Sequence, residues 1–151
     1  MRSYSSIPYG TQVRWKTVEA IAKTQAIDLW VLFPLGGVNR MLTQSGEIPP
    51  IWRRCLDDLL GTTEWYQHFY RVETSQLLFD DRQRLVKAET DVIANYFLDR
   101  LRTCFAGVAP NPAILYNSKN SPLYLLCFAA GNPKGAPLAL KIATHILKMG
   151  S

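Results

Sequence analysis

Two short runs of apolar residues stand out along the chain, because turn residues bound each of them. The first covers residues 26–33 (AIDLWVLF) and ends at Pro34, and the second covers residues 123–129. A continuous apolar run of this length is typical of a strand that is covered on both faces. We therefore expect two buried strands, the first with Asp28 near its start, where a carboxylate still reaches solvent.

Elsewhere, apolar residues recur three or four positions apart, which is the helical period. This spacing predicts helices over residues 18–24, 37–42, 50–60, 64–70 and 84–105, and a last helix after Asn132-Pro133. Pro49 and Pro50 suit the start of the helix over residues 50–60, and Gly61 suits its end.

The last helix and the segment over residues 72–81 are interpreted separately. In the last helix we expect a buried side made of Leu138, Ile142, Ile146 and Leu147. Residues 72–81 show no clear period, and they are predicted to form a loop with a helical turn.

A further apolar segment, residues 113–116, precedes the run at 123–129, and the linking residues 117–122 (NSKNSP) are typical of a turn. The link is too short for a helical crossover, so the two strands must be antiparallel. Because an isolated hairpin is marginal in water, we expect it to join the strand at 26–33. The predicted fold is an α/β domain in which several helices pack on a small mixed sheet.

The composition is that of one globular domain. The chain has 151 residues, of which 48% are hydrophobic and 19% are charged, enough to bury a core. No apolar run approaches the roughly 20 residues of a membrane span, and the first ten residues lack the apolar segment of a secretory signal. We expect a cytoplasmic protein with one domain over residues 1–149, and we interpret Gly150 and Ser151 as a cloning remnant.

Net charge and cysteine content exclude few classes of binding partner. The net charge is +5, but the basic residues are dispersed, which favours a solvated basic face over a nucleic-acid site. Cys55, Cys104 and Cys127 stand singly in apolar surroundings, a pattern that indicates neither a disulfide framework nor a zinc site. We expect three reduced cysteines that serve packing.

No motif in the sequence indicates a reaction. There is no G-x-G-x-x-G turn and no serine within G-x-S-x-G, and His68 and His145 have no acidic or thiol residue at metal-ligand spacing. We therefore expect no metal, no cofactor and no catalytic residue.

Three polar residues near the ends of the hairpin are the set for which a binding role is considered: Asn111, Asn132 and Lys134. The expected strand pairing brings Asn111 and Asn132 toward the same end of the sheet. Asparagine at a turn more commonly supplies backbone geometry, and both interpretations stay open.

Three long segments carry a family resemblance: PYGTQVRWKTVEAIAKTQAIDLWVLFPLG, GEIPPIWRRCLDDLLGTTEWYQHFY and FAGVAPNPAILYNSKNSPLYLLCFAAGNPKGAPLALKIATHIL. They resemble the three-Cys-motif partner (TcmP) family, whose fold is similar to that of Rossmann-like methyltransferases. The resemblance implies that this chain corresponds to the C-terminal half of that fold. It also implies a sheet in which residues 123–129 lie between residues 26–33 and residues 113–116.

The resemblance further implies that Pro8, Tyr9 and Gly10 correspond to a substrate-binding turn. The family tends to carry an acidic residue just before this proline, and here that position is Ile7. The resemblance also implies that this chain lacks the half that would carry the cofactor-binding turn. Both departures argue against methyl transfer by this chain alone.

A fold that lacks one half leaves the edge of the strand at 26–33 unpaired, and such an edge is a template for association. We predict a non-catalytic assembly module that forms a homodimer, or binds a partner protein, through this strand and neighbouring helices. The expected interface residues are Ile27, Leu29, Trp30, Val31 and Phe33. The alternatives are a methyltransferase-like or nucleic-acid-modifying fragment completed by another chain, and a nucleic-acid-binding module.

Overall fold

The computed structural model describes residues 14–77 and 80–150. The expected turn at Pro8, Tyr9 and Gly10 therefore lies outside the described residues. The helices are α1 (Trp15–Lys23), α2 (Leu35–Met41), α3 (Pro50–Leu60), α4 (Trp65–Phe69), α5 (Thr90–Arg102) and α6 (Ala136–Met149). The strands are β1 (Leu29–Phe33), β2 (Tyr70–Leu77), β3 (Asp80–Lys87), β4 (Gly107–Val108), β5 (Ala113–Tyr116) and β6 (Pro122–Ala130).

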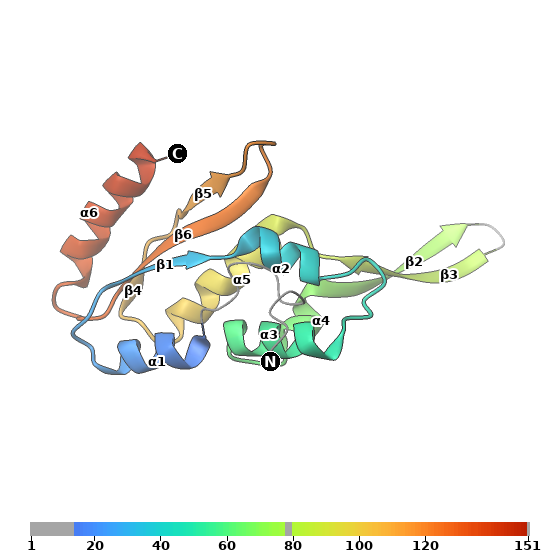
Figure 1. The fold of residues 1–151 in the computed structure, drawn as a ribbon, viewed down its shortest axis with the longest axis horizontal. Helices are drawn as coiled ribbons and strands as arrows, with labels where there is room; N and C mark the ends of the chain where they lie inside the picture. Colours follow the sequence, from blue (N-terminus) through green and yellow to red (C-terminus); the bar gives the residue numbers. More distant parts are fainter. Residues whose placement is uncertain (1–13, 78–79, 151) are drawn as a thin grey trace, which may run out of the picture.

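Strand β6 is the centre of the main sheet, as the resemblance implied (Figure 1). β1 pairs along one side of it, with Leu29 opposite Ala129 and Phe33 opposite Leu125. β4 and β5 pair along its other side. The α/β class is confirmed, but each of these pairings is antiparallel, so the expected mixed sheet is wrong for the described part of the chain. A mixed sheet would require a further strand that pairs with β1 in the parallel direction.

One face of the sheet is well covered. Residues directly opposite each other in an antiparallel ladder share a face, so Val31 and Cys127 point the same way. This face packs into the larger of two cores, to which helices α1 to α5 all contribute. Phe33 stacks on Phe97 of α5 with ring centroids 4.2 Å apart, and Phe97 meets the edge of Trp15 of α1.

The other face is covered only in part. α6 packs here, and its Ala143 and Leu147 form a smaller buried cluster with Phe128 and Ala130 of β6. Trp30 and Leu32 lie on the same face but keep 42% and 44% of their surface exposed. The expectation that β1 is covered on both faces is therefore wrong, because one helix is too narrow to cover both β6 and β1.

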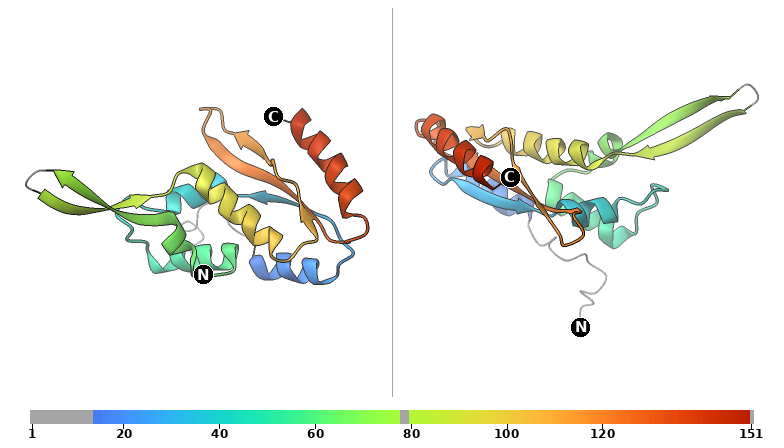
Figure 2. Two further views of the ribbon diagram at one scale, coloured as in Figure 1. Left: turned by 180° about the vertical axis from the view of Figure 1, so that it is seen from behind. Right: turned by 90° about the horizontal axis from the view of Figure 1, so that it is seen from above.

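Residues 72–81 are not the predicted loop. β2 and β3 form a long antiparallel hairpin that runs from the pair Tyr70 and Lys87 to the pair Leu77 and Asp80. The same finding corrects the start of the longest helix: residues 84–87 belong to β3, and α5 begins at Thr90. The hairpin, here called the arm, projects from one end of the molecule (Figures 1 and 2).

Candidate interaction surface

Helix α6 carries two apolar stripes, of which the sheet covers one. The covered stripe includes Ala136, Ala143 and Leu147, and the side chain of Leu140 fills the space that a Cβ atom on Gly107 would need. The uncovered stripe is spaced by three or four residues, and its exposed fractions are 66% for Leu138, 53% for Ile142, 47% for Ile146 and 76% for Met149.

This arrangement corrects the buried side expected for the last helix. Of the four residues named for it, Leu147 is buried, whereas Leu138, Ile142 and Ile146 are exposed. The spacing of the apolar residues already indicated this problem. A helix that is apolar over more than half its circumference can bury all of these residues only if other elements pack on more than one of its sides. The sequence could not show that only one side would receive such packing.

Strand β1 extends the uncovered surface. The ring of Trp30 lies against the ring of Phe128, with centroids 4.7 Å apart, and Phe128 belongs to the buried cluster beneath α6. Both Figure 1 and the right-hand view of Figure 2 show the start of β1 running beside α6. We refer to the exposed apolar residues of these two neighbouring elements together as the β1–α6 patch; they are Trp30, Leu32, Leu138, Ile142, Ile146 and Met149.

The β1–α6 patch is large for a protein of this size. If a fully accessible large apolar residue exposes roughly 200 Å², the exposed fractions of its six residues amount to about 650 Å². The largest apolar patch on a typical monomer is about 300–600 Å². One side of a standard protein–protein interface buries about 800 Å². The patch therefore approaches the size of an interface.

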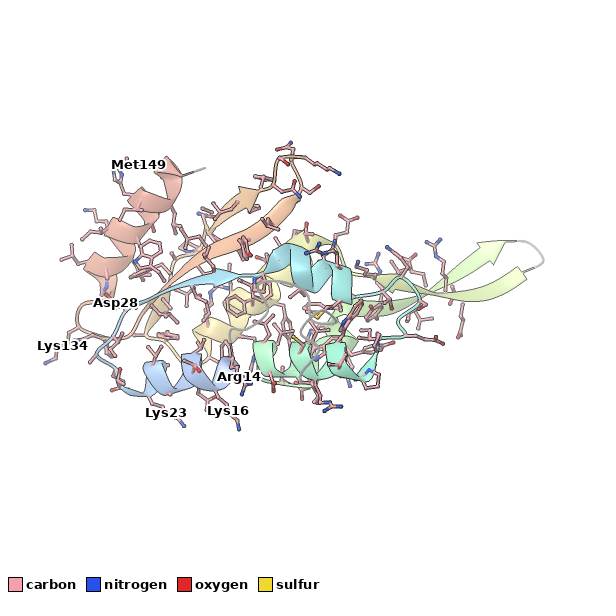
Figure 3. The ribbon with its side chains drawn as sticks, in the orientation of Figure 1. Arg14, Lys16, Lys23, Asp28, Lys134 and Met149 are labelled. Atoms are coloured by element: carbon pink, nitrogen blue, oxygen red, sulfur yellow. The ribbon has the colours of Figure 1, made fainter. Side chains whose placement is uncertain are left out.

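A basic strip borders the patch. Lys141, His145 and Lys148 are exposed on α6, and the helical period places them together beside the uncovered apolar stripe. The sequence of α6 contains no acidic residue. Figure 3 shows Met149 at the far end of α6 and Lys134 in the turn before the helix. The patch is thus apolar with a positive border.

The junction between β6 and α6 is held by Asp28. One of its carboxylate oxygens accepts a hydrogen bond from the Gly131 amide at 3.1 Å. Gly131 packs so closely that a Cβ atom would lie 2.2 Å from the Ile27 carbonyl oxygen. These two contacts fix the direction in which the chain leaves the sheet, and so position α6 next to β1.

Only some of the interface residues expected from the sequence are exposed in the structure. Ile27 and Trp30 are exposed, and Leu29 is half-buried. Val31 and Phe33 point into the larger core, so their side chains are not on the surface. Within the described ranges no strand pairs with the outer edge of β1, so pairing through that edge stays a prediction.

Of the three residues considered for binding, Asn132 and Lys134 lie together in the turn before α6, and Asn111 lies apart from them. The side chain of Asn132 accepts a hydrogen bond from the Lys134 amide at 2.9 Å, and its carbonyl accepts one from Ala136 at the start of α6. This geometry gives Asn132 a structural role at the turn. Asn111 is exposed between β4 and β5 and is no neighbour of Asn132 in the strand register, because β4 pairs with β6 between them.

A hollow lies where α4, β3 and the start of α5 meet, and His68, Lys87, Glu89 and Asp91 are among the residues that line it. The Lys87 ammonium donates a hydrogen bond to the Asn39 carbonyl at 2.7 Å, and burial lowers the pKa of this group. Among the described residues, no buried side-chain nitrogen or oxygen lacks a partner, and no group of three His, Cys, Asp or Glu residues could hold a metal. This hollow therefore carries no sign of a ligand.

Comparison of the chain with protein-family models, with curated proteins and with solved structures found no match. The resemblance to the three-Cys-motif partner family stays a prediction, and the functional argument rests on the geometry of the chain. None of the described helices is both long and apolar enough to span a bilayer.

Proposed function

We propose that this chain is a non-catalytic assembly module that associates with a second copy of itself through the β1–α6 patch. The observation that carries the proposal is the exposure of four large apolar side chains along α6 next to Trp30 and Leu32 of β1. An apolar surface of this extent usually marks an interaction site.

The magnitude of the hydrophobic effect supports association. Removing about 650 Å² of apolar surface from water contributes on the order of 15 kcal/mol at roughly 25 cal/mol per Å². Association costs about 4–15 kcal/mol in lost translational and rotational freedom. The contribution of the patch is therefore comparable to the cost before the partner's own buried surface is counted.

The charge of the chain supports this function over the alternatives. The described basic residues outside α6 are spread over α1, α2, α3, the arm, α5 and the turns next to β6, and several form ion pairs. A nucleic-acid-binding module and a fragment of a methyltransferase-like enzyme completed by another chain both stay predictions. No contact among the described residues favours either of them over assembly.

Sedimentation velocity tests the proposal with the substitution Ile142→Lys, which places a charge in the middle of the exposed stripe. We expect the native chain to sediment as a dimer at micromolar concentration and Ile142→Lys to sediment as a monomer. The matched control is Val92→Lys, because Val92 is also an exposed aliphatic residue on a helix, at 43%, but lies on α5 outside the patch. It should leave the dimer unchanged.

Circular dichroism should show both variants folded, because substitution of an exposed residue usually changes stability by less than about 0.5 kcal/mol. A native chain that stays monomeric from micromolar to several hundred micromolar would contradict the proposal. So would equal dissociation by Ile142→Lys and Val92→Lys.

A further inference from the structure

The outer edge of β1 is a side of the main sheet that has no partner strand among the described residues. β6 pairs along the inner side of β1, and no other described element shares an extensive contact with this strand (Figure 1). The unpaired side of an edge strand presents backbone N–H and C=O groups with which a further strand can pair. The hydrogen bonds of β6 determine which residues of β1 present these groups.

The backbone polar groups of β6 alternate between its two neighbours. The carbonyl of Phe128 accepts a hydrogen bond from the Ala109 amide, and the carbonyl of Ala130 accepts one from the Ala106 amide, both at 3.0 Å. In an antiparallel ladder the N–H and C=O groups of one residue point to the same side, and those of the next residue point to the other. Phe128 and Ala130 point toward β4, so Cys127 points toward β1.

The same alternation identifies the outward groups of β1. Val31 lies opposite Cys127, so its backbone groups bond to β6. Trp30 and Leu32, on either side of Val31, therefore direct their N–H and C=O groups toward the open edge. The side chains of these two residues also belong to the β1–α6 patch. Open hydrogen-bonding groups and exposed apolar side chains thus occur on the same two residues.

The exposed stripe of α6 lies on the side of this helix nearer to the β1 edge. The side chain of Leu140 packs against Gly107 of β4, so the Leu140 flank of α6 faces β4. β4 and β1 pair with opposite sides of β6. At about 3.6 residues per turn, Ile142 and Ile146 lie on the flank opposite Leu140. Their flank therefore faces β1.

We propose that β1 pairs antiparallel with β1 of a second copy, about a two-fold axis at Val31, so that the two main sheets join into one continuous sheet. This inference rests on the proposed function and specifies the contact by which the two copies associate. Trp30 of each copy lies opposite Leu32 of the other, and each such pair exchanges both of its backbone hydrogen bonds. The arrangement is symmetric and closes as a dimer.

The sequence around β1 favours this register over its neighbours. Val31 is the middle residue of β1, so an axis there pairs the whole strand. An axis at Leu32 would place Pro34 opposite Trp30, and proline has no N–H group to donate. An axis at Trp30 would place Asp28 opposite Leu32, and a carboxylate covered by an aliphatic side chain is unfavourable. A register that differs by one residue would pair side chains from opposite faces of the sheet.

The charge of α6 is compatible with this contact. Lys141 and Lys148 lie on the flank of α6 that contains Leu140, away from the β1 edge. When two sheets join edge to edge, the basic strips of the two helices therefore point away from each other. Like charges that face each other at an interface disfavour association, and this arrangement avoids that repulsion.

The apolar area available to two copies also suits a dimer. Two copies of the β1–α6 patch together offer about 1,300 Å² of exposed apolar surface. Stable protein–protein interfaces bury about 1,200–2,000 Å² in total. Backbone pairing along β1 adds hydrogen bonds to this surface and fixes the relative orientation of the two copies.

Amide hydrogen exchange, followed residue by residue by NMR, tests the pairing in the native chain. The reference is the Ile142→Lys chain, which is expected to be monomeric, at the same concentration. We expect the amides of Trp30 and Leu32 to exchange at least about tenfold more slowly in the native dimer than in this variant. The Val31 amide bonds to β6 and should be protected equally in both.

The matched control is the amide of Ile114. It lies opposite Leu125 on β5, the edge strand on the other side of β6, and by the same alternation its amide points away from the sheet. It should exchange equally fast in the native dimer and in the monomeric variant. Slowing of the Trp30 and Leu32 amides without slowing of Ile114 would locate the contact at the β1 edge.

A second test removes one outward hydrogen-bond donor. Leu32→Pro removes an N–H group that does not bond to β6, and proline is tolerated at such positions of edge strands. Leu32→Ala removes the same side chain but keeps the N–H group. We expect the dissociation constant of the Leu32→Pro dimer, measured by sedimentation equilibrium, to be at least about tenfold higher than that of Leu32→Ala. Circular dichroism checks that both variants fold.

The outcomes separate the two proposals. If Ile142→Lys abolishes the dimer but Trp30 and Leu32 exchange as fast as Ile114 in the native dimer, edge pairing is wrong and the assembly function stands. If these two amides are equally protected in the monomeric variant, another part of the same chain covers the edge, and the inference is overturned. Equal dissociation constants for folded Leu32→Pro and Leu32→Ala overturn it as well. A native chain that never associates overturns both proposals.

Discussion

At the scale of single residues, Gly61, Trp15 and Arg100 hold three helices together. Gly61 ends α3 in the left-handed conformation, with φ 71°. The Arg100 guanidinium of α5 donates to the carbonyls of Leu60 and Gly61 at 2.8 and 3.2 Å, and it lies 4.8 Å above the ring of Trp15. A cation at the C-terminal end of a helix is favourable, because the last carbonyls carry partial negative charge.

The substitution Gly61→Ala should destabilise the fold by about 2–4 kcal/mol. An L-residue costs about 1 kcal/mol or more in this backbone conformation, and overpacking costs about 1–3 kcal/mol. The added Cβ atom would lie 2.1 Å from the ring of Trp15. Urea denaturation measures the change.

Gly135→Ala is the control for this substitution. Gly135 has φ −89°, and a Cβ atom there would meet nothing within 4 Å. We expect a change within about 0.5 kcal/mol. Equal effects of the two substitutions would show that the ring of Trp15 does not constrain the end of α3.

At the scale of elements, the arm and the central strand should differ most in local stability. β6 is paired on both sides and lies between two cores, whereas among the described side chains of the arm those that join a core, Tyr70 and Leu85, lie toward its base. Protection from hydrogen exchange follows such differences, because a segment with few buried contacts opens without global unfolding. The arm should therefore be the first element to open.

Hydrogen exchange followed by mass spectrometry tests this expectation with Tyr70→Phe. The native arm should exchange at least about a hundredfold faster than β6.

Loss of the hydrogen bond from Tyr70 to Thr43 lowers the free energy of opening of the arm by about 1 kcal/mol. The Tyr70→Phe variant should therefore exchange in the arm about fivefold faster than the native chain, with β6 unchanged. Tyr116→Phe, at a half-exposed position of β5, should leave the arm unchanged. Exchange of the arm as slow as that of β6 would contradict its weak support.

At the scale of the whole molecule, Cys127 reports on global unfolding. It lies on β6 within the larger core, and burial raises the pKa of its thiol to about 12. Because the thiolate is the reactive form, Cys127 is inert in the folded chain at pH 8.5 and becomes reactive when the core opens. Cys55 and Cys104 are only half-buried.

Thiol labelling at pH 8.5 should therefore proceed in two phases. Cys55 and Cys104 should label first, and Cys127 should label at a rate that rises with urea as global unfolding does. Peptide mapping assigns each phase, and Cys127→Val should abolish the slow one. Labelling of Cys127 as fast as that of the other two would show that the sheet opens without global unfolding.

Much of the fold follows from local sequence. Pro49, Pro50 and Gly61 mark the ends of α3, and the short NSKNSP link forces β5 and β6 to be antiparallel, whatever packs around them. The sequence analysis did not predict the arm, because its strands consist mainly of polar residues. Such strands lack the alternation of apolar and polar residues by which strands are recognised. Residues 84–87 happen to continue the helical spacing of apolar residues in α5, so the prediction assigned them to that helix.

Periodicity identifies which residues share a side of an element, and this is a local property that the chain encodes directly. It does not state how many sides a neighbour will cover, because cover depends on the width and position of elements distant in sequence. The same apolar residues could have been buried on both faces of β1 and all around α6. The packing of one narrow helix on β6 and β4 left Trp30, Leu32 and the outer stripe of α6 exposed, and that arrangement created the candidate interface.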